Sequence, residues 1–500
     1  MNDSKAISNR LIIVSNRLPL VLNRGEDNNW EVKPGTGGLV TALAPVLKNR
    51  GGIWIGWPGV ADEDRVEIEK VLRLETKTAG YTFKTVGLTS EEVEGYYQGF
   101  SNEIIWPLFH DFQSNCVFNP DYWLVYKNVN KKFAEVISKY TKENDFIWVH
   151  DYHLICIAKQ LRRMKVMSKI AFFLHIPFPP LDIFVRLPWR FQILYSLLEY
   201  DLLGFQTLRD RRNFIQCVRT LLNDVNIVGK GQVVRAIWGD QETRIGAFAI
   251  GIDSKEFSNL AESQEVAERA WLIHQDIPNR KIIFGLDRLD YSKGIPERLK
   301  AYRRALEKFP ELHNNVTLVQ VVVPSRRDNA KYLSLKIEIE QLVSEINGQF
   351  SQTGWVPIHY HFKTLDRPEL TAYYRTAEIV LLTPLKDGMN LVAKEYCACD
   401  IEGKGVLILS EFAGAAAQLQ NGAILVNPHD IDGIAAAIYH AYHMSEEERI
   451  DRMKKLKRSI SRRNVFWWVD SFLQAAIAKN LNNFPLLEDY IPSDDEDEEI

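Results

Sequence analysis

Residues 381–396 read LLTPLKDGMNLVAKEY, and this stretch decides the fold. The apolar run at 378–382 is typical of a buried parallel strand, and residues 387–390 place turn residues and a capping side chain before an apolar helical segment. A helix therefore begins where a strand ends. Such a junction directs backbone N–H groups and the positive end of the helix dipole toward the carboxyl edge of the sheet, where phosphates bind. Glu395, one turn into the helix, is placed to meet a ribose; the alternative is an ordinary loop in which Glu395 only complements the dipole.

Composition narrows the class of protein. The chain has 500 residues, 46% of them hydrophobic and 25% charged, which suits a globular protein of two or more domains. Its net charge of −4 gives no global basic field, so we expect neither nucleic acid nor a membrane as a partner. Five cysteines are few for this length and fit a reducing cytosol. We find no signal core and no apolar run long enough to cross a bilayer, so a cytoplasmic protein is expected.

Strands and helices alternate through the first half of the sequence. Residues 11–14 form an apolar strand, and after a polar loop the glycine-rich segment 35–38 opens a helix. Further strands are predicted at 146–149, 170–174, 201–205 and 245–251, with a helix after the first of them. This is the order of a doubly wound parallel sheet.

The same pattern restarts after a charged, mostly helical stretch at 254–279. Strands are predicted at 281–285, 316–323, 378–382, 406–409 and 423–426, and helix signals follow them. Val465, Trp468 and Phe472 then share one face of a late amphipathic helix, and an acidic run ends the chain. We therefore predict an α/β protein with two Rossmann-like doubly wound domains facing across a cleft.

Two cations follow the first strand of the second half. The segment GLDRLDYSKG at 285–294 places Arg288 and Lys293 in a loop just past that strand, where they are able to clamp a diphosphate. The alternative is a solvated loop with a salt bridge to Asp287 or Asp290. A metal-dependent site would use a D-x-D pair, but residues 430–432 read better as a helix cap. We therefore expect no metal and no other cofactor.

In the first half, Asp151 and His175 fall at consecutive strand ends, within VHDYHL and FLHIPFP. A carboxylate and an imidazole there are able to hold sugar hydroxyls. The alternative is a hydrogen-bonded structural histidine and prolines that only shape a turn.

Seven segments together resemble the trehalose-6-phosphate synthase family of retaining glycosyltransferases. They are SNRLP, GTGGL, YYQGFSNEIIWP, HDYHL, HIPFP, LDRLDYSKG and DGMNLVAKEY, and the resemblance extends from near the N-terminus to about residue 485. It implies the two-domain GT-B fold and transfer of glucose from UDP-glucose to glucose 6-phosphate. It also implies an N-terminal acceptor domain at 1–253, a nucleotide-sugar domain at 254–464 and a helix at 465–487 that returns to the first domain. The acidic tail at 488–500, expected to be disordered, lies outside it.

The resemblance also implies roles for individual residues. Asp387 and His175 orient the donor glucose, and Asp151 contacts the acceptor sugar; these three, with Arg288 and Lys293, are the expected catalytic residues. The expected donor-binding residues are Gly37, Gly38, Arg288, Lys293, Asp387, Gly388, Met389, Asn390, Leu391, Val392, Ala393, Lys394 and Glu395. The expected acceptor-binding residues are Arg17, Tyr97, Trp106, Asp151 and Arg326.

Three other functions compete with this interpretation. A dinucleotide oxidoreductase is disfavoured because the glycines at 35–38 lack the G-x-G-x-x-G spacing. A catalytically silent regulatory paralogue predicts loss of the donor cations or acceptor arginines, and both are present. A glucosylglycerol-phosphate synthase would share the donor half and remains the nearest alternative. The sequence leaves open the choice among UDP, ADP and GDP, and it allows a homo-oligomer.

Overall fold

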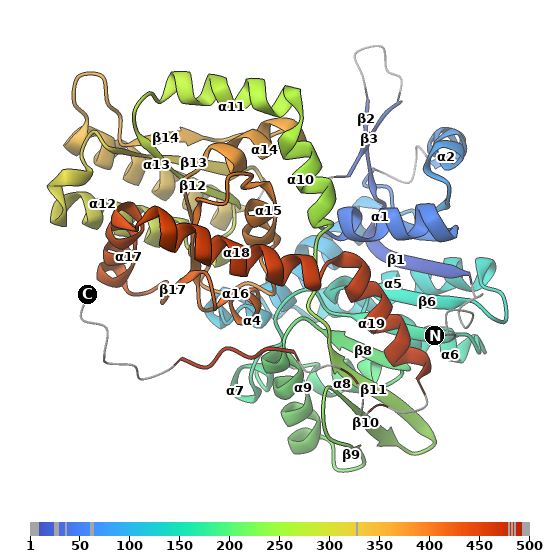
Figure 1. The fold of residues 1–500 in the computed structure, drawn as a ribbon. Helices are drawn as coiled ribbons and strands as arrows, with labels where there is room; N and C mark the ends of the chain where they lie inside the picture. The colour runs from blue at the N-terminus through green and yellow to red at the C-terminus, as the bar shows by residue number, and fades with distance from the viewer. Residues whose placement is uncertain are drawn as a thin grey trace, which may run out of the picture. The chain divides into compact units, whose positions relative to one another are not determined.

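The computed structural model describes residues 10–24, 30–35, 38–60, 65–326, 329–478, 481, 484 and 487–492 (Figure 1). Gly37 and the acidic run from residue 493 onward lie outside the described residues, and so the predictions made for them are not addressed. The chain forms two compact units. Unit 1 comprises Met1–Ala249 and Trp468–Leu487, and unit 2 comprises Ile250–Trp467 and Glu488–Ile500.

Unit 1 is built on a nine-stranded sheet, counted over the described residues, in the order β5-β4-β1-β6-β7-β8-β11-β10-β9. All neighbours from β5 to β11 are parallel, and the last two pairings are antiparallel. The strands are β1 (Leu11–Arg17), β4 (Gly52–Trp57), β5 (Thr82–Thr85), β6 (Phe146–His150), β7 (Lys169–Phe173), β8 (Leu202–Phe205), β9 (Asn226–Val228), β10 (Val233–Trp238) and β11 (Gln241–Ala247). The four predicted strand positions at 11–14, 146–149, 170–174 and 201–205 are confirmed, whereas the strand predicted at 245–251 ends at Ala247.

The helices of unit 1 include one unusual element, a π-helix at Val93–Ile105. The others are α1 (Gly38–Arg50), α2 (Arg65–Ala79), α3 (Ser90–Glu92), α4 (Trp106–Phe109), α5 (Pro120–Tyr140), α6 (Ile157–Arg163), α7 (Leu181–Phe184), α8 (Arg190–Leu197) and α9 (Leu208–Leu221), with short 3-10 turns at Gln113–Asn115 and Tyr152–Leu154. The polar loop predicted after the first strand is wrong in part, because β2 (Leu20–Arg24) and β3 (Trp30–Pro34) pair there as an antiparallel hairpin.

The late helix α19 (Val465–Ile477) is confirmed, and most of it packs in unit 1. Trp468 and Phe472 are fully buried. The Phe472 ring stacks on Trp148 of β6 with centroids 4.4 Å apart, and Trp468 lies 5.0 Å from the same tryptophan. The apolar face read from the sequence therefore covers the sheet of unit 1.

Unit 2 is built on a six-stranded sheet, among the described residues, in the order β14-β13-β12-β15-β16-β17, and every pairing in it is parallel. The strands are β12 (Lys281–Arg288), β13 (Val316–Val323), β14 (Ile358–His361), β15 (Ile379–Leu382), β16 (Val406–Ser410) and β17 (Ile424–Val426). All five predicted strands are present. Two details differ: β14 was not predicted, and β12 is longer than expected, so Arg288 ends a strand instead of lying in a loop.

Helices cover both faces of this sheet, as Figure 1 shows. On one face, α12 (Ile295–Lys308), α13 (Ala330–Phe350) and α17 (Ile431–His443) share an apolar core with the strands. On the other, the Tyr373 ring of α14 (Arg367–Thr376) stacks 5.3 Å from Phe284 of β12. The remaining helices are α10 (Ser254–Glu262), α11 (Gln264–Asp276), α15 (Leu391–Cys399), α16 (Ala416–Leu419) and α18 (Glu446–Arg462). None of the helices in the described part of the chain has the length and apolar character to span a membrane.

Strand order reverses once in each doubly wound sheet. In unit 1 the chain runs outward from β1 through β4 to one side and later through β6 to the other, and in unit 2 the same happens at β12 and β15. Ligands of such sheets bind in the crevice beyond the carboxyl ends of the strands at this point. The residues that follow β1, β6, β12 and β15 are therefore the candidates for the site.

Candidate active site

The switch point of unit 2 brings two predicted site residues together. Lys293 lies in a 3-10 turn, Tyr291–Lys293, after β12, and Asp387 lies in the loop after β15. The Lys293 ammonium donates to Asp387 Oδ2 at 2.6 Å, and the two side chains are only 12% and 14% exposed. Lys293 thus forms its ion pair with Asp387, and not with Asp287 or Asp290 as the alternative interpretation proposed.

The loop around Asp387 is held from several sides. The Asp387 carboxylate accepts hydrogen bonds from the Met389 backbone N–H at 3.2 Å and from the Asn390 side-chain NH₂ group at 3.3 Å. The backbone N–H of Asp387 donates to the carbonyl of Phe412, and its carbonyl accepts from Gly414. The loop after β16 thus holds the Asp387 backbone, while Met389, Asn390 and Lys293 orient the carboxylate.

The turn into α15 forms as the sequence predicts. Asn390 adopts a left-handed conformation, with φ of 76°, and its side chain accepts the Ala393 N–H at 3.1 Å. Asparagine tolerates this backbone region better than most residues, and its short amide is a favoured N-cap. Across the loop, Gly294 has φ of +61°, and a Cβ there would lie 2.3 Å from the Thr383 carbonyl oxygen. The close approach of the two loops thus requires glycine.

Two side chains of α15, those of Glu395 and Lys394, form hydrogen bonds to groups inside the protein. Glu395 accepts the Tyr374 hydroxyl at 3.0 Å, and burial raises the pKa of its carboxyl despite this hydrogen bond. Lys394 is fully buried, and its ammonium donates to the Ile250 carbonyl at 2.6 Å. Burial, with Arg463 nearby, lowers the pKa of Lys394 to about 7. The Lys394 side chain therefore anchors α15 internally, which leaves the backbone as the part of this residue that is able to meet a donor.

The other two predicted phosphate-binding cations of unit 2, Arg288 and Arg326, lie near Asp290. Arg326, at φ of 47°, donates to the Tyr332 hydroxyl and lies 3.8 Å from the Asp290 carboxylate, while Tyr332 donates to that carboxylate at 3.1 Å. Burial by itself raises the pKa of Asp290, but Arg326, Arg288 and Lys293 together lower it overall. Three of the predicted phosphate-binding cations are thus close enough to influence one carboxylate.

In unit 1, Arg17 and Tyr97 lie together as predicted. Arg17 ends β1, and its guanidinium lies 4.0 Å from the Trp57 ring centroid and 5.8 Å from that of Tyr97. The Tyr97 ring in turn stacks on His153 at 5.8 Å. Trp57 and His153 were not predicted as site residues, although His153 is part of the HDYHL segment.

Tyr97 is carried by the π-helix, which packs closely on α5. A Cβ at Gly95 would lie 2.9 Å from Val125, and one at Gly99 would lie 2.6 Å from the Tyr122 ring, so these glycines allow the contact. The next residue after this helix, Trp106, is buried, with its ring 5.7 Å from that of Tyr152. The predicted acceptor aromatics of unit 1 thus belong to one continuous aromatic cluster.

Asp151 and His175 follow adjacent parallel strands and touch. The backbone N–H of His175 donates to Asp151 Oδ1 at 3.2 Å, and Asp151 has φ of 77°. A non-glycine residue in this region is strained, and such strain gathers at functional sites. Asp151 therefore joins the candidate site on both position and backbone geometry. The His175 ring meets His150, which sequence reasoning missed.

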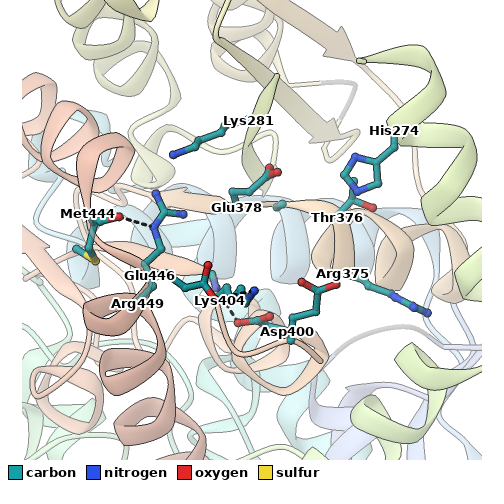
Figure 2. A pocket seen from close by; sticks show the side chains of 13 residues that line it. His274, Lys281, Arg375, Thr376, Glu378, Asp400, Lys404, Met444, Glu446 and Arg449 are labelled. Carbon is teal, nitrogen blue, oxygen red and sulfur yellow. Dashed lines mark hydrogen bonds and ion pairs between the residues drawn. The ribbon is translucent and has the colours of Figure 1, made fainter. Parts of the chain in front are cut away.

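A separate polar pocket of unit 2, with a volume of about 440 Å³, lies at the amino ends of the strands, opposite the candidate site (Figure 2). Lys281 begins β12 there, and Glu378 directly precedes β15. Figure 2 shows Arg449 reaching the Met444 carbonyl, at 3.0 Å, and Arg449 also donates to Ala441 near the end of α17. Because Arg449 bonds backbone carbonyls and the pocket lies away from the carboxyl ends of the strands, the pocket is not the candidate site.

Two doubly wound α/β units with polar site residues beyond their strand ends agree with the two Rossmann-like domains expected from the sequence, and the comparisons with known proteins identify the class as glycosyltransferases. A family model described as Glycosyltransferase family 20 matches residues 9–478. The chain belongs to this family, and the resemblance read from the sequence is confirmed.

Named relatives agree with this assignment. Trehalose-6-phosphate synthase of Mycolicibacterium vanbaalenii is 40% identical over 476 residues, which is 94% of this chain and 96% of the relative. The Mycobacterium tuberculosis protein of the same name is 39% identical over 469 residues, 93% of this chain and 94% of the relative.

Solved structures extend the similarity to the whole fold. An alpha,alpha-trehalose-phosphate synthase (UDP-forming) from Burkholderia xenovorans, in complex with glucose-6-phosphate, matches with a TM-score of 0.84 and 36% identity, covering 94% of this chain and 100% of that one. An E. coli structure described as trehalose-6-phosphate bound with UDP-2-fluoro glucose has the same TM-score and identity, covering 94% and 99%.

Proposed function

We propose that this chain transfers glucose from UDP-glucose to glucose 6-phosphate with retention of configuration, giving alpha,alpha-trehalose 6-phosphate and UDP. The observation that carries the proposal is the Lys293–Asp387 pair at the switch point of unit 2, beside the N-terminus of α15, in a member of glycosyltransferase family 20. Structures of relatives described as bound to glucose-6-phosphate and to UDP-2-fluoro glucose support the two substrates.

In the proposed reaction, negative charge grows on the departing diphosphate. Lys293, Arg288 and the first N–H groups of α15 are the groups that meet this charge, and they cost no reorganisation because they are held in place beforehand. Asp387 and His175 orient the donor glucose. Glu395 takes the ribose hydroxyls, and its half-buried carboxyl already accepts the Tyr374 hydroxyl.

The acceptor is held by a phosphate clamp and aromatic walls. Arg17 and Arg326 bind the phosphate, Tyr97 and Trp106 line the sugar, and Asp151 accepts a sugar hydroxyl. We assign no carboxylate nucleophile. The acceptor hydroxyl attacks the face from which UDP departs: its oxygen forms the new bond to the anomeric carbon, the bond to the phosphate oxygen breaks, and that oxygen receives the proton.

We propose a cytoplasmic location as well, supported by the low cysteine content and by four buried free thiols, Cys156, Cys217, Cys397 and Cys399. The same proposal includes no nucleic-acid partner, in line with the net charge of −4, and it allows a homo-oligomer.

The test is nucleotide release by the purified full chain with UDP-, ADP- and GDP-glucose, each with glucose 6-phosphate, glycerol 3-phosphate or no acceptor. We expect the highest kcat/KM with UDP-glucose and glucose 6-phosphate, and NMR of the product to give the alpha,alpha linkage. A higher kcat/KM with glycerol 3-phosphate would identify the glucosylglycerol-phosphate activity instead. Lack of turnover with every pair would indicate a silent paralogue.

A further inference from the structure

His150, the last residue of β6, is completely buried against the candidate site. Its Nδ1 lies 3.1 Å from Nε2 of His175, and the other ring nitrogen of His175, Nδ1, lies 3.4 Å from the Gln206 amide nitrogen. The three side chains therefore form a line of hydrogen bonds across the carboxyl ends of β6, β7 and β8.

The positions of the protons follow from this line. With the Gln206 amide nitrogen facing His175, an NH₂ group that only donates makes Nδ1 of His175 the unprotonated acceptor. A neutral His175 then carries its proton on Nε2 and donates it to Nδ1 of His150. His150 in turn carries its own proton on Nε2, a buried atom with no hydrogen-bond partner among the described residues. A second proton on either ring would place two N–H groups face to face.

The surroundings favour the same neutral state. Burial lowers the pKa of both rings, and for His150 the proximity of His175 lowers it further. The His150 ring lies 4.8 Å from that of Trp148 and 6.4 Å from that of Trp468. These apolar rings give an imidazolium no counter-charge. The Asp151 carboxylate accepts the backbone N–H of His175.

We infer that His150 is a positioning residue that holds the His175 imidazole in a single tautomer and orientation, so that Nδ1 of His175 is presented as a hydrogen-bond acceptor to a hydroxyl of the donor sugar. The inference rests on the proposed function, in which His175 orients the donor glucose. The sugar hydroxyl replaces the long hydrogen bond from Gln206 and donates its proton to His175.

The tautomer is measured directly by solid-state ¹⁵N NMR of the unliganded full chain labelled at histidine, with His175→Gln used to assign the His175 signals. We expect His175 protonated on Nε2 only. Protonation on Nδ1 would overturn the inference. This readout does not involve turnover, so it is independent of the proposed function.

Two variants separate positioning from packing. His150→Asn keeps an acceptor close to the position of Nδ1, and His150→Leu removes it. We expect His150→Leu to lower kcat by about tenfold or more, because a shift of the sugar by a fraction of an ångström is costly, and His150→Asn to recover most of the loss. In a His175→Ala background, His150→Leu should have no further effect on kcat/KM. Equal losses for the two variants, or additive losses in that background, would show that His150 only fills space.

Donor analogues test the direction of the hydrogen bond. UDP-glucoses in which one sugar hydroxyl is replaced by fluorine or by hydrogen should lose the same kcat/KM at the position that meets His175, because fluorine cannot donate. The difference from UDP-glucose should disappear in His175→Ala. Better use of the fluoro analogue at that position would show that His175 donates. If no position responds to His175→Ala, the donor role proposed for His175 fails, while the NMR result still decides the tautomer.

Discussion

Removal of the Lys293 charge tests the central pair of the site. Lys293 Nζ lies 2.6 Å from Asp387 Oδ2, and both side chains are nearly buried. Lys293→Met keeps the length of the side chain and removes its charge. If Lys293 meets the charge that grows on the leaving diphosphate, its loss should cost about 3 kcal/mol of transition-state stabilisation. This corresponds to a kcat about 150-fold lower, since 1.36 kcal/mol is a factor of ten.

A second effect must be separated from the first, because Lys293 also helps to hold Asp387. Without the ammonium, Asp387 keeps the Met389 N–H and the Asn390 amide as donors, so its loop should survive. We therefore compare Lys293→Met in the native chain and in an Asp387→Asn background. If Lys293 acts on the diphosphate, the double variant should lose further activity beyond Asp387→Asn. If Lys293 acts only through Asp387, it should not.

The assay is steady-state UDP release with saturating acceptor, which separates kcat from the KM for UDP-glucose. Lys300→Met is the matched control, because Lys300 is a lysine of the same unit whose exposed side chain forms a surface pair with Glu338 at 3.5 Å. An unchanged kcat with a raised donor KM would refute the reasoning. Lys293 would then bind the ground state and the transition state equally.

Four further outcomes are expected. Arg298→Met should lower the free energy of unfolding by about 3–5 kcal/mol, measured in urea, because it leaves the buried carboxylate of Asp287 unpaired. Adding Asp287→Asn should recover part of the loss, and an unchanged midpoint of urea unfolding in Arg298→Met would contradict this. Because the pKa of His175 is lowered to about 3 and that of His150 also lies below its usual value, the unfolded chain takes up protons below about pH 6.5 while the folded chain does not. Stability should therefore fall as the pH drops from about 6.5 toward 3, by up to about 1.4 kcal/mol per pH unit for each histidine, and melting curves of His175→Gln should show a shallower dependence. Arg17→Ala should raise the KM for glucose 6-phosphate at least about tenfold with little change for UDP-glucose, whereas Arg24→Ala, which removes another arginine stacked on a tryptophan, should change neither. EDTA should leave activity intact, and strong inhibition reversed by a divalent cation would refute the expectation of no metal.

The sequence by itself determined the elements whose causes are local. The strand β15, the turn and the helix α15 were predicted because a short apolar run, a turn dipeptide and an asparagine cap act within a few residues of one another. The cap at Asp430 was likewise predicted, and its side chain accepts the Gly433 N–H. The grouping of Arg17 with Tyr97 came from the family resemblance, since nothing local joins residues so far apart.

Only the tertiary structure decided the contacts between segments distant in the chain. Lys293 and Asp387 are 94 residues apart, and their pairing depends on β12 and β15 being neighbours in the sheet. His150 and His175 meet for the same reason, because β6 and β7 pair in parallel and end together. The close packing of α5 on the π-helix depends on two glycines brought against it, and Lys394 points inward to the Ile250 carbonyl. Hydrophobic periodicity and capping act over a few residues, whereas strand order and close packing are settled only when the whole sheet has formed.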